Sequence, residues 1–174
     1  MEYPISPQWD LHAKSRATDW TESSIMHMCG IDSIGSMWKA YNAAVSMFVP
    51  GCMLFLMKTG YPPMWEHASY VDLSIYSFIL TESDAQHCFQ EIMLYCCGGQ
   101  CSDDWCGTTF QIQNKRLLVK IWYNRSNQVS MQVLAQSMAA LMGRAIDLSC
   151  KRIAVQKKKN PKQSVGASRG AKRT

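Results

Sequence analysis

Six tryptophans are the residues best suited to chemistry in this sequence of 174 residues. Two of them, Trp20 and Trp65, lie in polar or Pro/Gly-rich stretches that are typical of loops. One loop tryptophan is as readily a partly buried packing residue as a binding residue. Two together are able to stack on both faces of a flat ring, at about 1–3 kcal/mol per stacked base. If the stacked ring is cationic, its attraction to an indole face adds about 0.5–2 kcal/mol to the stacking energy.

Charged groups accompany these aromatic rings. Glu66 directly follows Trp65, and a carboxylate accepts two parallel hydrogen bonds, which suits the N1–H and exocyclic amine of guanine. Cations that suit phosphates share one hairpin-like stretch with a further tryptophan: Lys115, Arg116, Lys120 and Trp122. The constellation predicts a purine-nucleotide clamp. The alternative is that the basic residues form a solvated hairpin and that Glu66 caps a helix, which explains the same charges.

Catalytic and metal-binding patterns are absent from the sequence. There is no G-x-S-x-G, no H-E-x-x-H and no P-loop lysine. The adjacent Asp103 and Asp104 suit a turn or a strand cap better than an acid/base pair. Four cysteines lie close together, without a C-x-x-C pair or a matching His pair: Cys96, Cys97, Cys101 and Cys106. We expect a binding protein rather than an enzyme, with no metal and no cofactor, and a zinc- or RNA-binding module is the weaker alternative.

The net charge of +5 conceals an uneven distribution. Nine of the 18 Lys and Arg residues lie in 151–174, which contains no Asp or Glu, so residues 1–150 carry nine basic against 13 acidic side chains, a net charge of −4. Charge-driven contacts therefore belong mainly to the C-terminal segment or to a local patch. We divide the chain into a folded domain, 1–156, and a basic mobile tail, 157–174.

The periodicity predicts three helices and five strands. The helices are expected from Asp32 or Ser33 to Pro50-Gly51, from Ser83 or Asp84 to Gly98-Gly99, and from Met131 to Gly143. Strands are expected at 52–57, 71–80, 108–113, 116–123 and 148–155, with a hairpin at Gln113–Arg116. On the strand at 116–123, Leu118, Lys120 and Trp122 face one side and an aliphatic stripe faces the core. This order favours an α+β fold, an antiparallel sheet with helices stacked on one side.

No targeting or membrane-spanning segment is apparent. The N-terminus lacks a basic region followed by an apolar run, and no stretch approaches the roughly 18 apolar residues that span a bilayer. We therefore expect a soluble, cytoplasmic monomer with reduced thiols.

Several motifs together resemble the eukaryotic translation initiation factor 4E family of messenger RNA cap-binding proteins. The resemblance covers about residues 3–155 and rests on the following motifs: Trp9-Asp10-Leu11, Trp38-Lys39-Ala40-Tyr41-Asn42, Pro63-Met64-Trp65-Glu66, Asp103-Asp104-Trp105 and Val119-Lys120-Ile121-Trp122. It implies a curved antiparallel sheet with three helices on its convex face. It also implies that Trp20 and Trp65 sandwich 7-methylguanine, that Glu66 binds the guanine edge and that Trp122 contacts the methyl group.

The sequence differs from the family pattern at the phosphate-binding positions. Gln113 stands where the family has an Arg, Lys115 matches a family Lys, and Leu118 replaces the next Lys. We expect Arg116 and Lys120 to supply charge here, helped by tail lysines: Lys157, Lys158, Lys159 and Lys162.

A second surface is implied for a protein partner that presents a helical motif. Its matching positions on the convex side are Pro4, Ile34, Trp38, Glu91 and Leu94, with Gln90 in place of an aliphatic residue. Trp38 as a pure core residue is the alternative. His12 replaces a family Trp, which suggests a divergent paralogue from a protist lineage such as the kinetoplastids, with a cap that carries extra methyl groups. Two roles stay open, an adaptor in translation initiation and a cap-binding repressor or storage factor.

Overall fold

A single antiparallel sheet of seven strands organises the chain. The computed structural model describes residues 2–15, 19–124 and 130–153. The strand order is β2-β1-β3-β5-β6-β4-β7, and every neighbouring pair is antiparallel. The strands are β1 (Pro4–Ser15), β2 (Met26–Ser33), β3 (Cys52–Lys58), β4 (Leu73–Thr81), β5 (Trp105–Gln113), β6 (Arg116–Asn124) and β7 (Ser149–Ile153).

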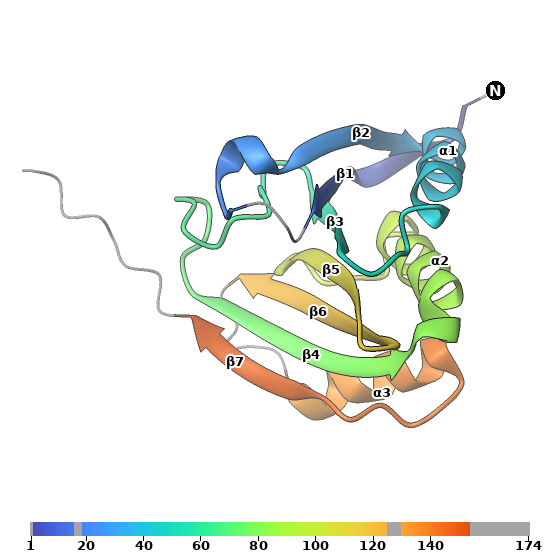
Figure 1. Ribbon diagram of the computed structural model, residues 1–174, viewed down its shortest axis with the longest axis vertical. Helices are drawn as coiled ribbons and strands as arrows, with labels where there is room; N and C mark the ends of the chain where they lie inside the picture. The colour runs from blue at the N-terminus through green and yellow to red at the C-terminus, as the bar shows by residue number, and fades with distance from the viewer. Residues whose placement is uncertain (1, 16–18, 125–129, 154–174) are drawn as a thin grey trace, which may run out of the picture.

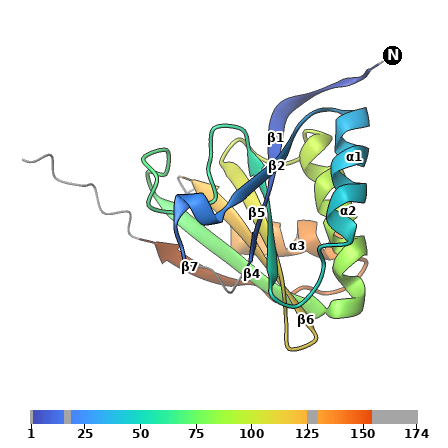
Figure 2. The same ribbon diagram turned by 45° about the horizontal axis from the view of Figure 1, so that its top comes forward.

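Three helices cover one face of this sheet. They are α1 (Ile34–Val45), α2 (Ala85–Cys97) and α3 (Met131–Met142), with short 3-10 turns at Glu22–Ser24 and Glu82–Asp84. Figures 1 and 2 show the helices together on one side of the curved sheet, with the other side uncovered by helices. The predicted α+β architecture is therefore confirmed. We call the face away from the helices the open face.

Local signals explain where the helices begin and end. Ser33 caps α1, because its hydroxyl oxygen accepts a hydrogen bond from the Ser36 backbone N–H at 3.2 Å. Gly143 ends α3 in the left-handed conformation, with φ of 64°. The helix α1 ends at Val45, before the predicted stop at Pro50-Gly51, and a turn fills the interval.

The orientation of α1 exposes its first residue. The buried stripe of α1 is Met37, Ala40 and Ala44, whereas Ile34 is 39% exposed. The small alanines face the sheet, so the larger Ile34 and Trp38 point outward. Met131, the first residue of α3, is exposed as well.

The predicted β5–β6 hairpin is confirmed. Asn114 and Lys115 have φ of 53° and 58°, the left-handed pair that a two-residue turn between twisted strands requires. The register pairs Gln113 with Arg116 and continues to Trp105 and Tyr123.

Strands β1 and β2 were not predicted. The alternation of buried Trp9, Leu11 and Ala13 with polar residues between them was a readable period-two signal. Proline at positions 4 and 7 and the polar residues of this segment made it look like an irregular terminus.

Side chains alternate between two separate apolar clusters. The main core lies between the sheet and the helices, and includes Leu117, Val119 and Ile121 of β6. The open face has a smaller cluster: Met53, Phe55, Met57, Tyr70, Leu73, Ile75, Cys106 and Trp122. The predicted division of β6 between a core side and an opposite side that carries Lys120 and Trp122 is therefore confirmed.

Candidate functional site

The two loop tryptophans meet at one edge of the open face. The ring centroids of Trp20 and Trp65 lie 5.9 Å apart, with the planes inclined by 33°. The edge of Trp20 also contacts Phe55, at 6.2 Å between centroids. Both indoles are accessible, since Trp20 is 50% and Trp65 38% exposed. Two segments far apart in the sequence thus present one aromatic pair.

The gap of this pair is closed in the structure. A ring held between two others needs about 7 Å between them, because stacked carbon atoms approach to about 3.5 Å. The cavity lined by Trp20, Pro63, Met64, Trp65 and Glu66 measures about 30 Å³, roughly the volume of one water molecule. The indoles must separate by about 1 Å and become more parallel before a base enters. Glu66 is exposed at the rim of this gap.

Lys14 is a site residue that sequence reasoning missed. It is 2% exposed, and its ammonium lies 4.9 Å from the centre of a Trp20 ring. The same group donates a hydrogen bond to the Ser15 carbonyl oxygen at 2.9 Å. The alternation that places Trp9 and Leu11 in the main core directs Lys14 to the open face, where it pairs with Met53. The aromatic pair therefore already carries a nearby positive charge.

Trp122 lies on the same face but is covered. Its indole N–H donates to the Thr109 hydroxyl at 2.9 Å, and the Tyr70 ring lies 5.8 Å away. With 3% exposure, it forms part of the floor of the open face.

The segment that carries Trp65 and Glu66 is anchored to the end of β6. The Asn124 carboxamide oxygen accepts from the backbone N–H of Val71 at 2.8 Å, and its NH₂ donates to the Ser69 carbonyl at 3.0 Å. The Tyr70 hydroxyl donates to the Pro62 carbonyl oxygen at 2.6 Å. These bonds tie both ends of the Trp65 segment. Asn124 has no motif that would have revealed this role.

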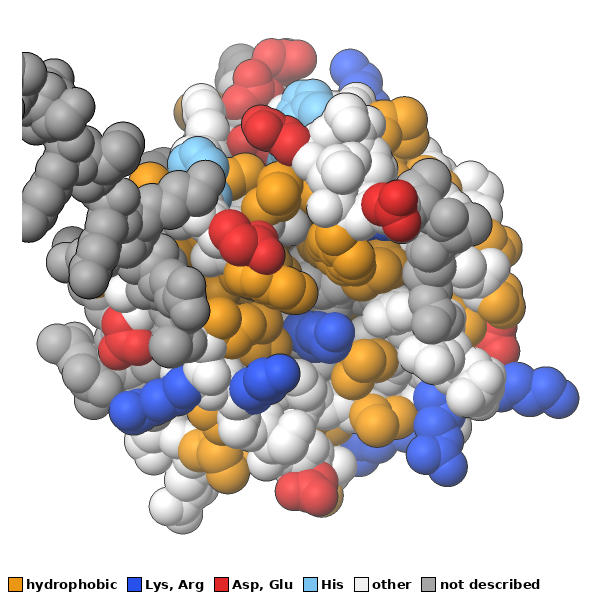
Figure 3. Space-filling model, turned by 60° about the vertical axis from the view of Figure 1, so that its left-hand side comes forward, with side chains coloured by type: hydrophobic (Ala, Val, Ile, Leu, Met, Phe, Trp, Pro, Cys, Tyr) orange, Lys and Arg blue, Asp and Glu red, His pale blue; other side chains and the backbone are white. Residues whose placement is uncertain are grey.

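The predicted phosphate-binding residues differ in their surroundings. Gln113, Lys115 and Arg116 are exposed at the hairpin turn, and Leu118 and Lys120 follow on the open-face side of β6. Burial lowers the pKa of Lys120, and the positive charge of Lys151 lowers it further. Figure 3 shows Lys and Arg side chains beside a hydrophobic area on the face away from the helices. The tail lysines Lys157, Lys158, Lys159 and Lys162 lie outside the described residues.

The convex side presents a separate apolar patch. Ile34, Trp38 and Leu94 are exposed on α1 and α2, and Pro4 is exposed at the start of β1. Trp38 is 40% exposed, so its alternative reading as a pure core residue is wrong. Gln90 and Glu91 are half-buried on α2. We call Ile34, Trp38 and Leu94 the helix patch.

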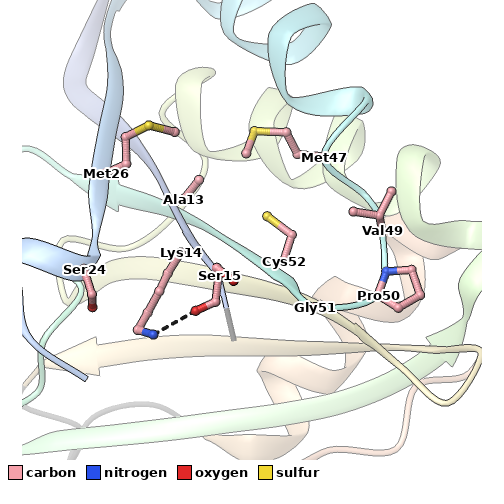
Figure 4. Close-up of a pocket in the computed structure, with 10 residues that line it drawn as sticks. All are labelled: Ala13, Lys14, Ser15, Ser24, Met26, Met47, Val49, Pro50, Gly51 and Cys52. Carbon is pink, nitrogen blue, oxygen red and sulfur yellow. Dashed lines mark hydrogen bonds between the residues drawn. The ribbon is translucent and has the colours of Figure 1, made fainter. Parts of the chain in front are cut away.

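A larger cavity of about 810 Å³ adjoins the site at Lys14. Figure 4 shows its lining, in which Met26, Met47, Val49 and Cys52 lie above Lys14 and its bond to the Ser15 carbonyl. None of the predicted binding residues lines it. Its apolar walls offer few groups that would bind a charged nucleotide.

The described part of the chain has neither a metal-binding cluster nor a membrane-spanning helix. Within residues 2–15, 19–124 and 130–153, no group of three or more His, Cys, Asp or Glu side chains is arranged to hold a metal ion. Cys96 and Cys97 end α2, and Cys106 is the second residue of β5. No described helix is long and apolar enough to cross a membrane.

Comparisons with known proteins agree with the geometry. The sequence model of the family described as Eukaryotic initiation factor 4E matches residues 4–168. C. elegans eIF4E-3, in a complex with the 4E-binding protein Mextli and a cap analog, is similar at 19% identity with a TM-score of 0.74, covering 86% of this chain and 92% of that chain. Ascaris suum eIF4E-3 with an m7G cap is similar at 20% identity with a TM-score of 0.71, covering 97% of this chain and 100% of that chain.

A further similar structure extends the range of bound caps. Ascaris suum eIF4E-3 with an m2,2,7G cap is 21% identical, with a TM-score of 0.71, and the match covers 92% of this chain and 95% of that chain. No significant match is found among curated proteins. At these identities, the structural likeness establishes the fold.

Proposed function

The chain belongs to the Eukaryotic initiation factor 4E family, and on that basis we propose that it binds the 7-methylguanosine 5′ cap of messenger RNA. The observation that carries the proposal is the approach of Trp20 and Trp65 to 5.9 Å on one face of the sheet, with Glu66 on the rim of the gap between them. The similar C. elegans and Ascaris suum proteins are described with a cap analog, an m7G cap and an m2,2,7G cap.

In the proposed mechanism, the indoles open and stack on both faces of the methylated base. Methylation at N7 makes guanine cationic, so each indole adds a cation–π attraction to its stacking energy. The Glu66 carboxylate accepts hydrogen bonds from N1–H and the 2-amino group, and these are stronger because they involve charge. Trp122 contacts the methyl group once Tyr70 shifts from its ring. Selectivity for the methyl group thus comes from charge as well as from shape.

Cations near β6 take the phosphates in this proposal. Lys120 projects from the same side of β6 as Trp122, and Lys115 and Arg116 lie at the turn. Gln113 offers a neutral hydrogen-bonding side chain in place of a family Arg. The cap-binding domain comprises 1–156, and the tail 157–174 adds Lys157, Lys158, Lys159 and Lys162 as further phosphate contacts.

The convex side supports a role in translation initiation. The residues of the helix patch, Trp38 and two aliphatic side chains, are each exposed, and exposed aromatic residues are typical anchors of protein interfaces. The similar C. elegans protein is described in complex with the 4E-binding protein Mextli. The chain acts as an adaptor that holds the cap on one face and an initiation scaffold on the other.

Gln90 favours a partner with an altered motif. Its polar side chain is half-buried on α2 beside Glu91. An aliphatic residue of a partner therefore gains less binding energy here than it would against an aliphatic side chain. A pull-down with the purified chain separates the two roles. A scaffold recovered with its helicase indicates an adaptor, whereas capped RNA recovered without a scaffold indicates a repressor or storage factor.

Calorimetric titration with 7-methylguanosine triphosphate and plain guanosine triphosphate tests the cap-binding proposal. We expect at least roughly tenfold tighter binding of the methylated nucleotide, which is about 1.4 kcal/mol. The variant Glu66→Gln should weaken binding of the methylated form by about tenfold or more, since a charged hydrogen bond contributes about 1.5–3 kcal/mol. The matched control Glu91→Gln, on the opposite face, should leave both affinities unchanged. Equal affinities for the two nucleotides would refute the proposal.

A further inference from the structure

A second lysine shares the open face with Lys120. Across the sheet, Trp122 pairs with Ile75, and Ile75 pairs with Lys151 of β7. In the next row Lys120 pairs with Ser77. Residues in register on neighbouring strands point to the same side, so both lysines share the side of Trp122. Two strand spacings, about 10 Å, separate the backbone of Lys151 from that of Trp122.

The two lysines form an uncompensated positive pair. Lys120 is half-buried and Lys151 is exposed, and each raises the electrostatic cost of the other's charge. Burial lowers the pKa of Lys120 first, and the charge of Lys151 lowers it further. Among the described residues neither amine has an ion pair with a carboxylate. An anion between them would relieve this repulsion.

The alternative path along β6 is neutral and apolar beyond Lys120. Leu118 is the next side chain on the open face, about 7 Å along the strand, and it pairs with Ile79 of β4. Arg116 comes about 14 Å beyond Lys120. The nearest further described cation on the open face is therefore across the strands, at Lys151.

A hollow beside the lysines offers room for a ribose. It has a volume of about 370 Å³ and lies where β4 and β7 meet the segment after α3. Its lining residues include Ser77, Ser149 and Asp147, and the Ser149 hydroxyl donates to the Ser77 carbonyl oxygen at 3.3 Å. Asp147 repels a phosphate but accepts a hydrogen bond from a ribose 2′-hydroxyl, the group that distinguishes RNA from DNA.

We propose that Lys120 and Lys151 direct the RNA that follows the cap across β6, β4 and β7, so that the open face binds the first transcribed nucleotides as well as the cap. The proposal rests on the proposed cap-binding function. The base stacks at Trp20 and Trp65, the triphosphate reaches Lys120, and Lys151 contacts a phosphate of the following chain. The Ser77 and Ser149 hollow receives the adjoining ribose.

The test compares two ligands on full-length protein. One is 7-methylguanosine triphosphate and the other is a capped tetraribonucleotide, each titrated at several salt concentrations into the wild type, Lys151→Ala and Lys39→Ala. Lys39 is exposed on α1, so its variant removes the same charge from the opposite face. We expect Lys151→Ala to weaken binding of the capped tetranucleotide by roughly threefold to tenfold. The slope of its log affinity against log salt concentration should fall by about 0.7. Affinity for the free cap nucleotide should stay within about twofold.

Each contrary outcome has a distinct meaning. Equal weakening of both ligands would place Lys151 at the triphosphate and overturn its assigned contact. Unchanged binding of the capped tetranucleotide, or the same loss in Lys39→Ala, would overturn the proposed path. If the wild type binds neither ligand, the cap-binding function itself fails. A capped oligodeoxynucleotide that binds as tightly as the RNA would refute the ribose hollow.

Discussion

Trp20 already contacts a cation before any base arrives. The Lys14 ammonium lies 4.9 Å from the centre of its ring, and Lys14 itself is almost fully buried. The Trp20 ring therefore holds a cation against it in this structure, by the attraction that a cationic base would also experience.

The half-buried position of Lys120 predicts a measurable contribution to phosphate binding. Lys120→Met keeps the aliphatic stem that packs on the sheet and removes the charge. We expect affinity for 7-methylguanosine triphosphate to fall by roughly threefold to tenfold, with a salt slope lower by about 0.7. Titrations at several salt concentrations measure both, with Lys39→Met as the control. Unchanged affinity and slope would reject the phosphate contact.

His12 predicts a loss of stability in acid. Burial lowers the pKa of His12 below its ordinary value of 6.5, the nearby His27 lowers it further, and Asp10 opposes the shift. Below pH 6.5 the unfolded chain therefore binds more protons at this position than the folded chain, and folding stability falls as the pH falls. His12→Gln should lose less stability than the wild type between pH 7.5 and pH 5.5.

Urea unfolding at these two pH values measures the difference. The control is His87→Gln, because His87 is exposed on α2 and should follow the wild type. An identical loss of stability in the wild type and in His12→Gln would contradict the assignment.

At the scale of elements, a loop and a strand end cooperate to hold Trp65. Asn124 is the last residue of β6. Its side chain accepts hydrogen bonds from the backbone N–H groups of Val71 and Asp72 and donates one to the Ser69 carbonyl oxygen. Tyr70, between these residues, covers Trp122. The loop that carries half of the aromatic pair is thus fastened to the strand that supplies the floor.

Removal of this fastening should weaken both binding and folding. Asn124→Ala leaves partly buried backbone groups without partners, which costs about 1 kcal/mol. We expect weaker binding of 7-methylguanosine triphosphate by at least about threefold, with a cooperative unfolding transition retained at lower temperature. Calorimetric titration and thermal unfolding measure the two effects. Asn42→Ala, on the exposed side of α1, is the control, and equal affinities in the two variants would contradict the anchoring role.

The elements with strong local signals were predictable from sequence. The capping residue Ser33, the glycines at 98 and 143, and the Asn114-Lys115 turn mark boundaries that the structure keeps. β1 and β2 lack such signals. β1 contains two prolines and changes its register against β2.

The site was predictable in its residues more than in its shape. Trp20, Trp65 and Glu66 could be selected from the sequence because their side chains suit a purine. Lys14, Asn124 and Lys151 could not, since their positions at the site depend on which strands pair and in which register. The closed gap between the indoles depends on side-chain packing that no spacing encodes.

At the scale of the whole molecule, two surfaces lie on opposite sides of one sheet. The open face carries the tryptophan pair, and the helix patch lies on the side covered by α1 and α2 (Figure 2). The main core of the protein separates them. A substitution on one side should therefore leave binding on the other side intact.

Trp38→Ala tests this independence. The indole is 40% exposed and packs edge-to-face on Tyr41 at 5.7 Å. We expect the variant to lose binding of a scaffold-derived helical peptide by at least about tenfold, while affinity for 7-methylguanosine triphosphate stays within about twofold. Trp65→Ala should show the reverse pattern. Loss of both activities in Trp38→Ala would show that the two faces are not independent.

The most direct measurement of the central claim is a structure of the protein with 7-methylguanosine triphosphate. We predict that the ring centroids of Trp20 and Trp65 move from 5.9 Å to about 7 Å, with the planes closer to parallel than the present 33°. The methylated base should lie between them, with the Glu66 carboxylate within hydrogen-bonding distance of N1 and the 2-amino group. A base bound elsewhere, with the indole pair unchanged, would contradict the account.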